Sequence, residues 1–371
     1  MNESPNHLQR LLGEFDPSLP LERARTIPSN WYTDSTLYRA ECDQVFRPSW
    51  VAVGRVDQVA EPGMYLTAEL AGEPLLVVRD QTGTLRAFYN LCRHRAARVA
   101  VQDQGRCGHF RCRYHGWTYD LDGRLLGTPE FGGVEDFKKE DQGLAKLAVD
   151  AWGPLVFVHA GEPRCTLKEY LNPLAGTEST LGLDRLKFAA RREYQLACNW
   201  KVFVDNYLDG GYHINTIHPG LAGLIDYSKY RTTIAGNTCL QSGPLTSNAE
   251  SGEKTRTGTA YYWWVFPNLM LNVYAETMDI NIVLPDGPDR CRVLFDFYFL
   301  HTEGPEAKRW QAESIAVSDQ IQAEDGEICE DVQRGLHSSN YSTGRFCVKR
   351  EVGGYHFHRL LAERLEKASK V

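Results

Sequence analysis

The sequence predicts an α+β protein in which a small all-β module is inserted near the start of a larger unit of antiparallel strands and helices. From Trp50 to about Gly161, short β-like runs alternate with Gly, Pro, Asp and Asn residues that mark turns. After Pro163, long apolar and aromatic runs stand between helical segments, a mixture typical of α+β domains. We expect a helical segment over residues 1–46 that packs on the main domain, the all-β module over 47–161, and the main domain over 162–371.

Composition narrows the class of protein before any motif is considered. Of the 371 residues, 42% are hydrophobic and 24% are charged, as in soluble globular proteins. No apolar run reaches the roughly eighteen residues of a membrane span, and a net charge of −7 with dispersed basic residues gives no reason to expect nucleic acid. The first thirty residues show no export signal, so we expect a cytoplasmic protein whose ten cysteines are reduced thiols or metal ligands.

The N-terminal stretch "PSNWYTDSTLYRAECDQVFRPSW" predicts a turn followed by a helix. Ser29 or Asn30 is a candidate cap, and Tyr38, Cys42 and Phe46 lie four residues apart on one helical face. The β-like runs that follow in the module are "WVAVGRV", "MYLTAEL", "EPLLVVRD", "LRAFYNL" and "GPLVFVHA".

The main domain mixes helical and strand patterns. The stretch "LACNWKVFVDNYLDGGYHINTIHPGL" predicts a helix that becomes irregular around Gly210 and Gly211. Antiparallel strands are predicted for "TAYYWWVFPNLMLNVYA", "MDINIVLP" and "CRVLFDFYFL". One long helix is predicted for "EAKRWQAESIAVSDQIQAEDGEICEDVQRGL".

Cysteine and histidine pairs mark a first metal site inside the β module. Cys92 and His94 form C-x-H, Cys112 and His115 form C-x2-H, and seventeen residues separate the pairs. Zinc tolerates such ligands, but its usual motifs put two cysteines in one arm and two histidines in the other. Arms that each supply one Cys and one His suit a Rieske [2Fe–2S] cluster, in which one iron takes both thiolates and the other both imidazoles. We interpret the intervening Cys107 and His109 as non-ligands.

A second metal site is suggested by His213 and His218. On an ideal helix these rings would diverge by about 140°, so the helix must be distorted for both to face one ion. A distant carboxylate would complete a two-His, one-carboxylate set, which leaves positions open on Fe(II) for O2. The acidic candidates in the long predicted helix are Glu324, Asp325, Glu327, Glu330 and Asp331.

Ordered motifs along nearly the whole chain resemble a known family. They are "IPSNWYTDSTLYRAECDQVF", "NLCRHRA", "CRYHGWTYDLDGRL", "VDNYLDGGYHINTIHPGL", "FPNLMLNVY", "MDINIVLP", "ICEDVQRGL" and "YHFHRLLA". The sequence resembles the oxygenase (alpha) subunits of Rieske non-haem iron oxygenases, and within them choline monooxygenase and related quaternary-ammonium (betaine or carnitine) monooxygenases. The resemblance implies a Rieske domain followed by a helix-grip-like catalytic domain with an antiparallel sheet.

The resemblance also implies roles for individual residues. Cluster ligands would be Cys92, His94, Cys112 and His115, and iron ligands would be His213, His218 and Asp325, with Glu324 as the alternative to Asp325. Asp209 matches an acidic residue that links the iron site to the cluster of a neighbouring subunit. It lies four residues before His213 rather than three, because "DGGYH" holds an extra glycine. Arg113 replaces a commoner proline and places a cation near the cluster.

The implied activity is a monooxygenase reaction. A [2Fe–2S] cluster and mononuclear Fe(II) would use O2, with electrons from NAD(P)H through a separate flavin or iron–sulfur reductase, and the oxygenase would be a homotrimer. The substrate would be a small cationic compound such as choline, a betaine or a carnitine-like molecule. Aromatic faces attract such a cation, at about 0.5–2 kcal/mol each; candidate pocket residues are Tyr207, Tyr262, Trp264, Phe266 and Tyr274, for which core packing is the alternative.

Two other functions remain open on sequence grounds. An aromatic-ring hydroxylating dioxygenase alpha subunit would use the same two metal sites with an apolar pocket. A Rieske ferredoxin-like electron carrier would need only the first site, whereas His213, His218 and Asp325 suggest a second one.

Overall fold

The computed structural model describes residues 5–218, 225–245 and 258–368. The chain forms two compact units, one of residues 46–168 and one of residues 1–45 together with 169–371. Both units contain antiparallel sheets and the larger one adds long helices, which confirms the predicted α+β class. Within the described ranges, none of the helices is long and apolar enough to cross a membrane.

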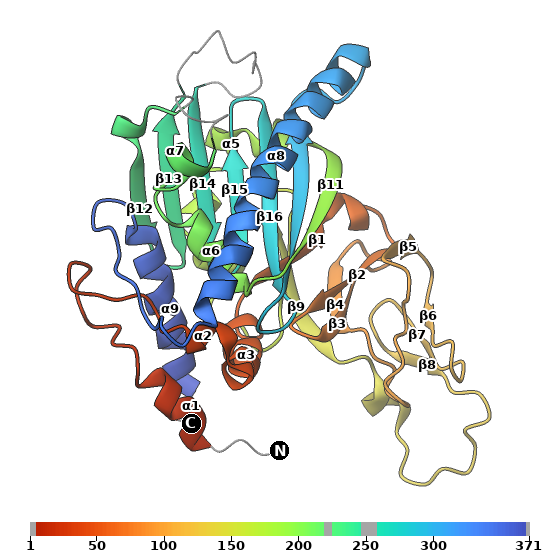
Figure 1. Ribbon diagram of the computed structural model, residues 1–371. Coiled ribbons are helices and arrows are strands. Elements are labelled where there is room, and N and C mark those ends of the chain that lie inside the picture. Colours follow the sequence, from red (N-terminus) through yellow and green to blue (C-terminus); the bar gives the residue numbers. More distant parts are fainter. Residues whose placement is uncertain (1–4, 219–224, 246–257, 369–371) are drawn as a thin grey trace. The chain divides into compact units, whose positions relative to one another are not determined.

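The smaller unit is built from two antiparallel sheets (Figure 1). Seven strands form one sheet in the order β1-β10-β9-β4-β3-β2-β5, and β6, β7 and β8 form the other. The strands are β1 (Val51–Arg55), β2 (Met64–Leu70), β3 (Glu73–Arg79), β4 (Leu85–Tyr89), β5 (Gln104–Arg106), β6 (Phe110–Arg111), β7 (Thr118–Tyr119), β8 (Leu125–Gly127), β9 (Lys146–Trp152) and β10 (Leu155–His159). The predicted β-like runs are confirmed as β1, β2, β3, β4 and β10.

The sequence analysis did not predict the short strands of the smaller unit. Strands β5 to β8 have two or three residues each, which is too few to show an alternating pattern. Phe110 of β6 and Tyr119 of β7 still enter one buried cluster, together with Trp117, which precedes β7, and Phe88 of β4. This cluster also contains Cys92 and Cys112, so the predicted ligand loops are anchored in the core of the unit.

The larger unit is organised around one antiparallel sheet (Figure 1). Its strand order is β11-β17-β16-β15-β14-β13-β12. The strands are β11 (Lys187–Leu196), β12 (Arg231–Ala235), β13 (Thr238–Pro244), β14 (Thr259–Val265), β15 (Leu269–Val273), β16 (Thr277–Pro285) and β17 (Cys291–Phe299). The predicted apolar runs are strands, and the longest of them, "TAYYWWVFPNLMLNVYA", is split into β14 and β15 by a turn at Phe266–Asn268.

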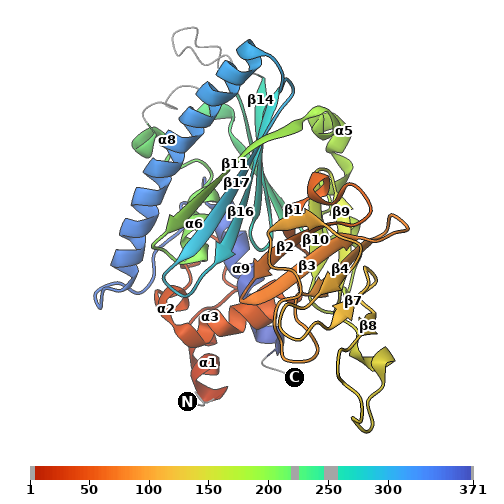
Figure 2. The same ribbon diagram turned by 90° about the vertical axis from the view of Figure 1, so that its right-hand side faces the viewer.

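Three helices of the larger unit, α6, α8 and α9, cover one face of its sheet (Figure 1). Figure 2 shows α8 running along the sheet with α6 beside it. The α-helices are α1 (Pro5–Leu12), α2 (Asn30–Thr33), α3 (Ser35–Glu41), α4 (Leu167–Tyr170), α5 (Glu178–Leu181), α6 (Trp200–Tyr207), α7 (Ile214–Ile217), α8 (Pro305–Leu336) and α9 (Val352–Ala368). Short helical turns are η1 (Cys42–Phe46, a π turn), η2 (Val56–Val59), η3 (Lys139–Gln142), η4 (Leu174–Gly176), η5 (Leu183–Arg185) and η6 (Tyr227–Lys229).

The N-terminal helix is capped differently from our expectation. Ser29 precedes α2 but its side chain makes no capping hydrogen bond, and Asn30 is already the first residue of α2. The cap of α3 is Asp34, whose carboxylate accepts from the backbone N–H groups of Thr36 and Leu37 at 2.7 and 3.1 Å. We expected one turn followed by one helix, with the cap at its start. The segment instead forms two helices separated at Asp34, so the cap lies between them.

A buried ion pair fastens the N-terminal segment to α6. Lys201 Nζ lies 2.6 Å from Glu41 Oε1, and both side chains are fully buried. The second carboxylate oxygen accepts from Trp200 Nε1 at 2.8 Å. Burial raises the pKa of Glu41 and lowers the pKa of Lys201, and their mutual attraction opposes both shifts. The pair therefore ties α3 to the helix that leads into the predicted iron site.

We expect the Lys201→Met variant to lose about 3–5 kcal/mol of unfolding free energy, because it leaves the Glu41 carboxylate buried without a cation. The double variant Glu41→Gln with Lys201→Met should recover most of that loss, since no charge remains and the introduced side-chain amide can still accept from Trp200. Urea unfolding followed by tryptophan fluorescence measures both. Equal stability of the single and double variants would contradict this account.

Candidate metal centres

His213, His218 and Asp325 converge in the larger unit. The Nε2 atoms of His213 and His218 lie 3.6 and 3.2 Å from Asp325 Oδ1, and one donor atom from each residue lies within 4.8 Å of the others. The two imidazole rings are 5.2 Å apart and inclined by 76°. Asp325 reaches this point from α8, and the histidines reach it from the two ends of the one-turn helix α7.

Gly210 makes this arrangement possible. Helix α6 ends at Tyr207, and the next turn takes Gly210 and Gly211 through φ values of +73° and +70°, which side chains disfavour. A Cβ atom at Gly210 would lie 2.2 Å from the carbonyl oxygen of Arg350. The chain therefore leaves the path of α6 before His213, and His218 ends the one-turn helix α7 outside helical geometry, with φ of −110° and ψ of 78°.

Each histidine is oriented by a carboxylate on its other nitrogen. His213 Nδ1 lies 2.6 Å from Asp209 Oδ2, and His218 Nδ1 lies 2.7 Å from Glu324 Oε2. Donation from Nδ1–H to these carboxylates leaves both Nε2 lone pairs directed at Asp325. The extra glycine after Asp209 does not break its contact with His213, and Asp209 also accepts from the backbone N–H of His213 at 3.0 Å.

The geometry separates the two candidate acidic ligands. Asp325 faces the Nε2 atoms of both histidines, whereas Glu324 is occupied by His218 Nδ1 and by Gln320 Nε2 at 2.8 Å. Glu324 therefore fits an orienting role, and Asp325 fits that of a ligand.

Electrostatics around His218 favour a bound cation at Nε2. Burial lowers the pKa of His218, but hydrogen bonds and charges from Asp325 and Glu324 outweigh it, so the pKa lies above its usual value. The Gln320 amide and His218 lower the pKa of Glu324. A proton and a metal ion compete for the same nitrogen, so acid solution favours the metal-free site. Two imidazoles and one carboxylate are the donor set that suits ferrous iron with open positions, so these residues fit the metal.

Asn206 is a site residue that sequence reasoning missed. Its Nδ2 donates to Asp325 Oδ1 at 2.8 Å. Asn206 lies in the last turn of α6, and Asp209 follows two residues after that helix ends at Tyr207. In the sequence, the three-residue spacing of Asn206 and Asp209 within "DNYLD" was the pattern that could have identified Asn206. Asn206 restrains the carboxylate oxygen that both histidines face.

The predicted cluster ligands lie on two loops of nearly identical form. In the first, Cys92 N donates to Ala97 O at 2.8 Å and Ala96 N donates to Cys92 O at 2.9 Å. In the second, Cys112 N donates to Trp117 O at 2.8 Å and Gly116 N donates to Cys112 O at 3.0 Å. The fifth residue of each loop is left-handed, with φ of +56° at Ala96 and +74° at Gly116. Alanine rarely adopts this conformation, so the first loop carries some strain.

The loops bring the four predicted donors together around a space larger than one ion. The rings of His94 and His115 are 4.6 Å apart, and the buried Cys92 and Cys112 thiols interact with each other. No three of the four donor atoms lie within 4.8 Å of one another, in contrast to the donors of the His213 site. This wider set fits a two-iron group better than a single zinc ion.

His94 gives the most direct test of fit for the cluster. Its Nδ1 atom is buried and has no hydrogen-bond partner among the described residues. Burial, His115 and Arg95 lower the pKa of His94, so the ring is neutral and its lone pair is available. A buried nitrogen without a partner is unfavourable unless something else binds it. The residues therefore fit a [2Fe–2S] group.

Aromatic residues hold the first loop in place. The indole of Trp117 stacks on His94 at 4.9 Å with an angle of 7°, and Tyr119 Oη contacts Cys92 Sγ at 3.3 Å while accepting from Arg93 N at 3.0 Å. Cys107 is half-buried beside the core and His109 is exposed, and their roles as non-ligands stay a prediction.

Tyrosines gather close to the Asp209–His213 segment. Tyr262 lies 6.4 Å from Tyr230 and 6.1 Å from Tyr274, and Tyr207 donates to Asn272 Oδ1 at 2.8 Å. Tyr207 and Tyr230 have raised pKa values because of burial and the charges of their neighbours. We call Tyr207, Tyr230, Tyr262 and Tyr274 the tyrosine cluster. Tyr230 was not among the predicted residues; a Cβ added at Gly211 would lie 3.4 Å from its ring.

A buried carboxylate adjoins the tyrosine cluster. Asp279 is 4% exposed and accepts from Asn272 Nδ2 at 2.7 Å and Asn281 Nδ2 at 3.0 Å. Its charge contributes to the raised pKa of Tyr207. Tyr207, Asn272 and Asp279 thus form one hydrogen-bonded chain from α6 into the sheet.

Two predicted pocket residues lie elsewhere. Trp264 packs against Phe266 at 5.9 Å and against Phe357 of α9 at 5.5 Å, and Trp264 and Phe266 are fully buried. Tyr262 and Trp264 occupy the same side of β14, but the strand carries Trp264 two residues further along, under α9. The structure places both residues in the core and does not bring them to the tyrosine cluster.

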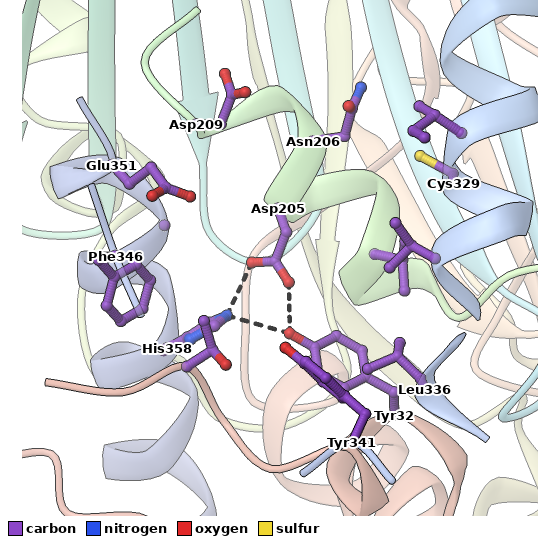
Figure 3. A pocket seen from close by; sticks show the side chains of 15 residues that line it. Tyr32, Asp205, Asn206, Asp209, Cys329, Leu336, Tyr341, Phe346, Glu351 and His358 are labelled. Carbon is purple, nitrogen blue, oxygen red and sulfur yellow. Dashed lines mark hydrogen bonds and ion pairs between the residues drawn. The ribbon is translucent and has the colours of Figure 1, made fainter. Parts of the chain in front are cut away.

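A cavity of about 200 Å³ lies between α6, α8 and the start of α9 (Figure 3). Asp205 lines this cavity, and its carboxylate accepts hydrogen bonds from Tyr32 Oη at 2.6 Å and from His358 Nε2 at 2.8 Å. His358 Nδ1 accepts from the backbone N–H of Ile27, which fixes Nε2 as the donor. Asp209 and Asn206 also line the cavity, so it adjoins the His213 site.

Comparisons with known families agree with this arrangement. Residues 49–138 match the Rieske [2Fe-2S] domain, and residues 183–367 match the ring hydroxylating alpha subunit (catalytic domain). The chain is 41% identical to choline monooxygenase, chloroplastic, of Arabidopsis thaliana, over 97% of this chain and 87% of that protein. It is 31% identical to the carnitine monooxygenase oxygenase subunit of Escherichia coli (strain K12), over 92% of this chain and 94% of that protein.

Solved structures show the same fold. The quaternary ammonium Rieske monooxygenase CntA in complex with L-carnitine matches with a TM-score of 0.82 and 29% identity, over 93% of this chain and 99% of that chain. Naphthalene 1,2-dioxygenase with indole bound matches with a TM-score of 0.77 and 16% identity, over 96% and 98% of the two chains. At that identity the second likeness concerns the fold alone.

We expect Asp325→Asn to remove most metal binding at the His213 site, because it replaces the carboxylate whose oxygen faces both Nε2 atoms. Glu324→Gln should weaken metal affinity by about 10–100-fold, as loss of an orienting partner does. Titration of the metal-free site with Co(II) under argon measures both affinities, and the visible spectrum checks that the cluster is intact. The reverse order of effects would identify Glu324 as the ligand.

Proposed function

The chain belongs to the choline monooxygenase family of Rieske non-haem iron oxygenases, and we propose that it hydroxylates a small quaternary ammonium compound of the choline, betaine or carnitine type. The observation that carries this proposal is the convergence of His213, His218 and Asp325 in the same chain as the Cys92–His115 loops. An electron carrier would need only the loops.

The two cofactors of the family, a [2Fe–2S] cluster and mononuclear iron, supply electron storage and O2 reduction beside a substrate C–H bond. We assign Cys92, His94, Cys112 and His115 to the cluster, and His213, His218 and Asp325 to the iron. The residues around the iron site fix these donors. Asp209 and Glu324 hold the imidazole tautomers, and Asn206 holds Asp325 Oδ1.

The tyrosine cluster and Asp279 support a cationic substrate. A trialkylammonium group cannot donate hydrogen bonds, so it is recognised by aromatic faces and by negative charge in a site sheltered from water. The tyrosine cluster provides aromatic faces close to the Asp209–His213 segment, and the buried Asp279 carboxylate provides the negative charge. An arene would gain nothing from a buried carboxylate, so this interior favours the cation over the alternative of a ring-hydroxylating dioxygenase.

The overall reaction fixes which products to expect. One O2, two electrons and two protons convert a substrate C–H bond to C–OH and release one water. Attack at the carbinol carbon of choline yields an aldehyde hydrate. Attack at an N-methyl carbon yields an unstable carbinolamine that releases formaldehyde.

Enzymes of this family need O2 and a separate electron donor. We propose an NAD(P)H-dependent reductase of the flavin or iron–sulfur type as that donor, and a homotrimer in which Asp209 links the iron site to the cluster of a neighbouring copy. The hydrogen bond from His213 to Asp209 supports such a link. If an Asp209→Ala variant kept both metals and full coupled turnover, this link through Asp209 would be contradicted. A cytoplasmic location stays a prediction, and the plant relative is named as chloroplastic.

With a generic reductase, we expect choline, glycine betaine or carnitine to trigger NADH and O2 consumption, while benzoate and naphthalene should not. Labelled ¹⁸O₂ should appear in the product, and formaldehyde should be scored separately from aldehyde to distinguish the carbon attacked. Asp325→Asn is the matched control, since it should keep the cluster but show no substrate-triggered O2 uptake. Turnover with arenes alone would contradict the proposed substrate class.

A further inference from the structure

Three cysteines outside both metal centres meet in the interior of the larger unit. Cys198 lies two residues after β11, Cys291 is the first residue of β17, and Cys329 lies on α8. All three are buried and carry free thiols. Cys198 Sγ lies 3.8 Å from Cys291 Sγ and accepts a hydrogen bond from the Cys329 thiol. We call these three residues the thiol cluster.

Hydrogen bonds on both sides of Cys198 hold it against α8. The backbone N–H groups of the preceding and the following residue donate to Glu330 Oε1 and Gln333 Oε1, each at 2.9 Å. Cys329 directly precedes Glu330 on this helix. Because both neighbours of Cys198 are tied to the turn of α8 that carries Cys329, the two thiols meet in a fixed arrangement.

The protons of the thiol cluster are shared unequally. S–H donation from Cys291 and Cys329 lowers the pKa of Cys198, against the effect of burial. The same hydrogen bonds, together with burial, raise the pKa values of Cys291 and Cys329. Cys239 gives the contrast, since burial raises its pKa to about 12. The cluster therefore favours the thiolate form at Cys198, and the thiolate is the nucleophilic form of cysteine.

Cys329 connects the thiol cluster to the cavity beside the iron site (Figure 3). It lines this cavity together with Asn206 and Asp209. It also lies one helical turn beyond Asp325 on α8. The cavity therefore offers a small neutral molecule formed at the His213 site a route to the Cys329 sulfur inside the protein.

Hydrogen peroxide is such a molecule. O2 that takes up two electrons and two protons without attack on a substrate C–H bond leaves as H2O2. Peroxide converts a thiolate to a sulfenic acid, and a second thiol converts the sulfenic acid to a disulfide. Core packing alone gives no reason for three thiols to meet, because a buried cysteine packs as a small apolar residue.

We infer that the thiol cluster is an oxidation site for hydrogen peroxide formed at the neighbouring iron site, where Cys329 reacts first and Cys198 then closes a disulfide with it. The source of the peroxide rests on the proposed function. The reactivity of the thiols rests on their own geometry, so the two are tested separately.

Each step of this reaction balances. Cys329 passes its proton to Cys198 along their hydrogen bond, and its thiolate attacks one peroxide oxygen, so that the O–O bond breaks and hydroxide leaves. That hydroxide takes the proton from Cys198 and becomes water. The Cys198 thiolate then attacks the sulfenic sulfur of Cys329, the S–O bond breaks, and the second hydroxide takes the proton of Cys291. Two thiols lose two electrons in total, and one H2O2 becomes two waters.

Added peroxide tests the thiols themselves. The protein keeps its [2Fe–2S] cluster, a chelator keeps the His213 site free of metal, and H2O2 is added under argon. Light and heavy alkylating reagents, applied before and after reduction by a dithiol, count the reversibly oxidised cysteines, and trypsin leaves the three cluster cysteines on separate peptides. We expect Cys198 and Cys329 to be oxidised about tenfold faster than the buried Cys239, and to appear as one cross-linked pair.

Single variants locate the reaction. Cys198→Ala should form no cross-link and should leave Cys329 as a sulfenic acid that dimedone traps. Cys329→Ala should slow the oxidation of Cys198 about tenfold, because the thiol that lines the cavity is gone. Cys291→Ala should still form the cross-link. Cys239→Ala removes a buried thiol of the same unit and is the matched control, which should leave the rate unchanged. Tryptophan fluorescence checks that each variant is folded.

Turnover without substrate tests the source of the peroxide. The iron-loaded protein receives reductant and O2 in the presence of catalase, which destroys peroxide that has left the protein. We expect the Cys198–Cys329 cross-link to form nonetheless. A cross-link that forms only when catalase is omitted would contradict the route through the cavity.

Other outcomes also overturn the inference. Oxidation of Cys198 and Cys329 at the rate of Cys239 would make the thiol cluster an ordinary part of the core. A cross-link between Cys198 and Cys291 in the wild type would contradict the assigned order. If added H2O2 forms the expected cross-link but turnover consumes no O2, the thiol site stands and the proposed function fails.

Discussion

The larger unit depends on one constraint, which is that two imidazoles five residues apart must face one carboxylate. A regular helix would turn these rings away from each other; instead they stand at the two ends of the one-turn helix α7, which the chain reaches through Gly210, where no side chain fits against Arg350. Asp209 and Glu324 then fix the rings from their outer nitrogens. The carboxylate itself comes from the far end of the chain, on α8, and Asn206 of α6 restrains it. The rest of the unit brings α6 and α8 together on one face of the sheet, so that these contacts can form.

The sequence predicted the parts of this arrangement that are local. Periodicity identified α8 and the long strands, and the paired C-x-H and C-x2-H motifs identified the cluster loops without any three-dimensional information. It could not choose between Asp325 and Glu324, because adjacent residues on a helix point about 100° apart and only the position of α7 decides which faces the histidines. Trp264 was placed with Tyr262 by strand alternation, yet distance along β14 and the position of α9 separate them. Tyr230 and Asp279 were missed because their proximity depends on strand pairing across the sheet.

Charge is arranged differently in the two units. The smaller unit presents exposed arginines around its ligand loops, whereas the larger unit holds its carboxylates in hydrogen bonds beside the iron site and the tyrosine cluster. Buried negative charge suits retention of a metal ion and of a small cation, since little water competes inside the protein.

The most direct test of this account is the iron and acid-labile sulfide content of the anaerobically reconstituted protein, combined with EPR of the reduced state. The account predicts about three iron atoms and about two sulfides per chain, with an EPR signal typical of a Rieske cluster. It also predicts loss of one iron, with that signal unchanged, when both His213 and His218 are replaced by alanine. A preparation with two iron atoms per chain whether or not these histidines are present would contradict it, because the second metal centre would then not exist.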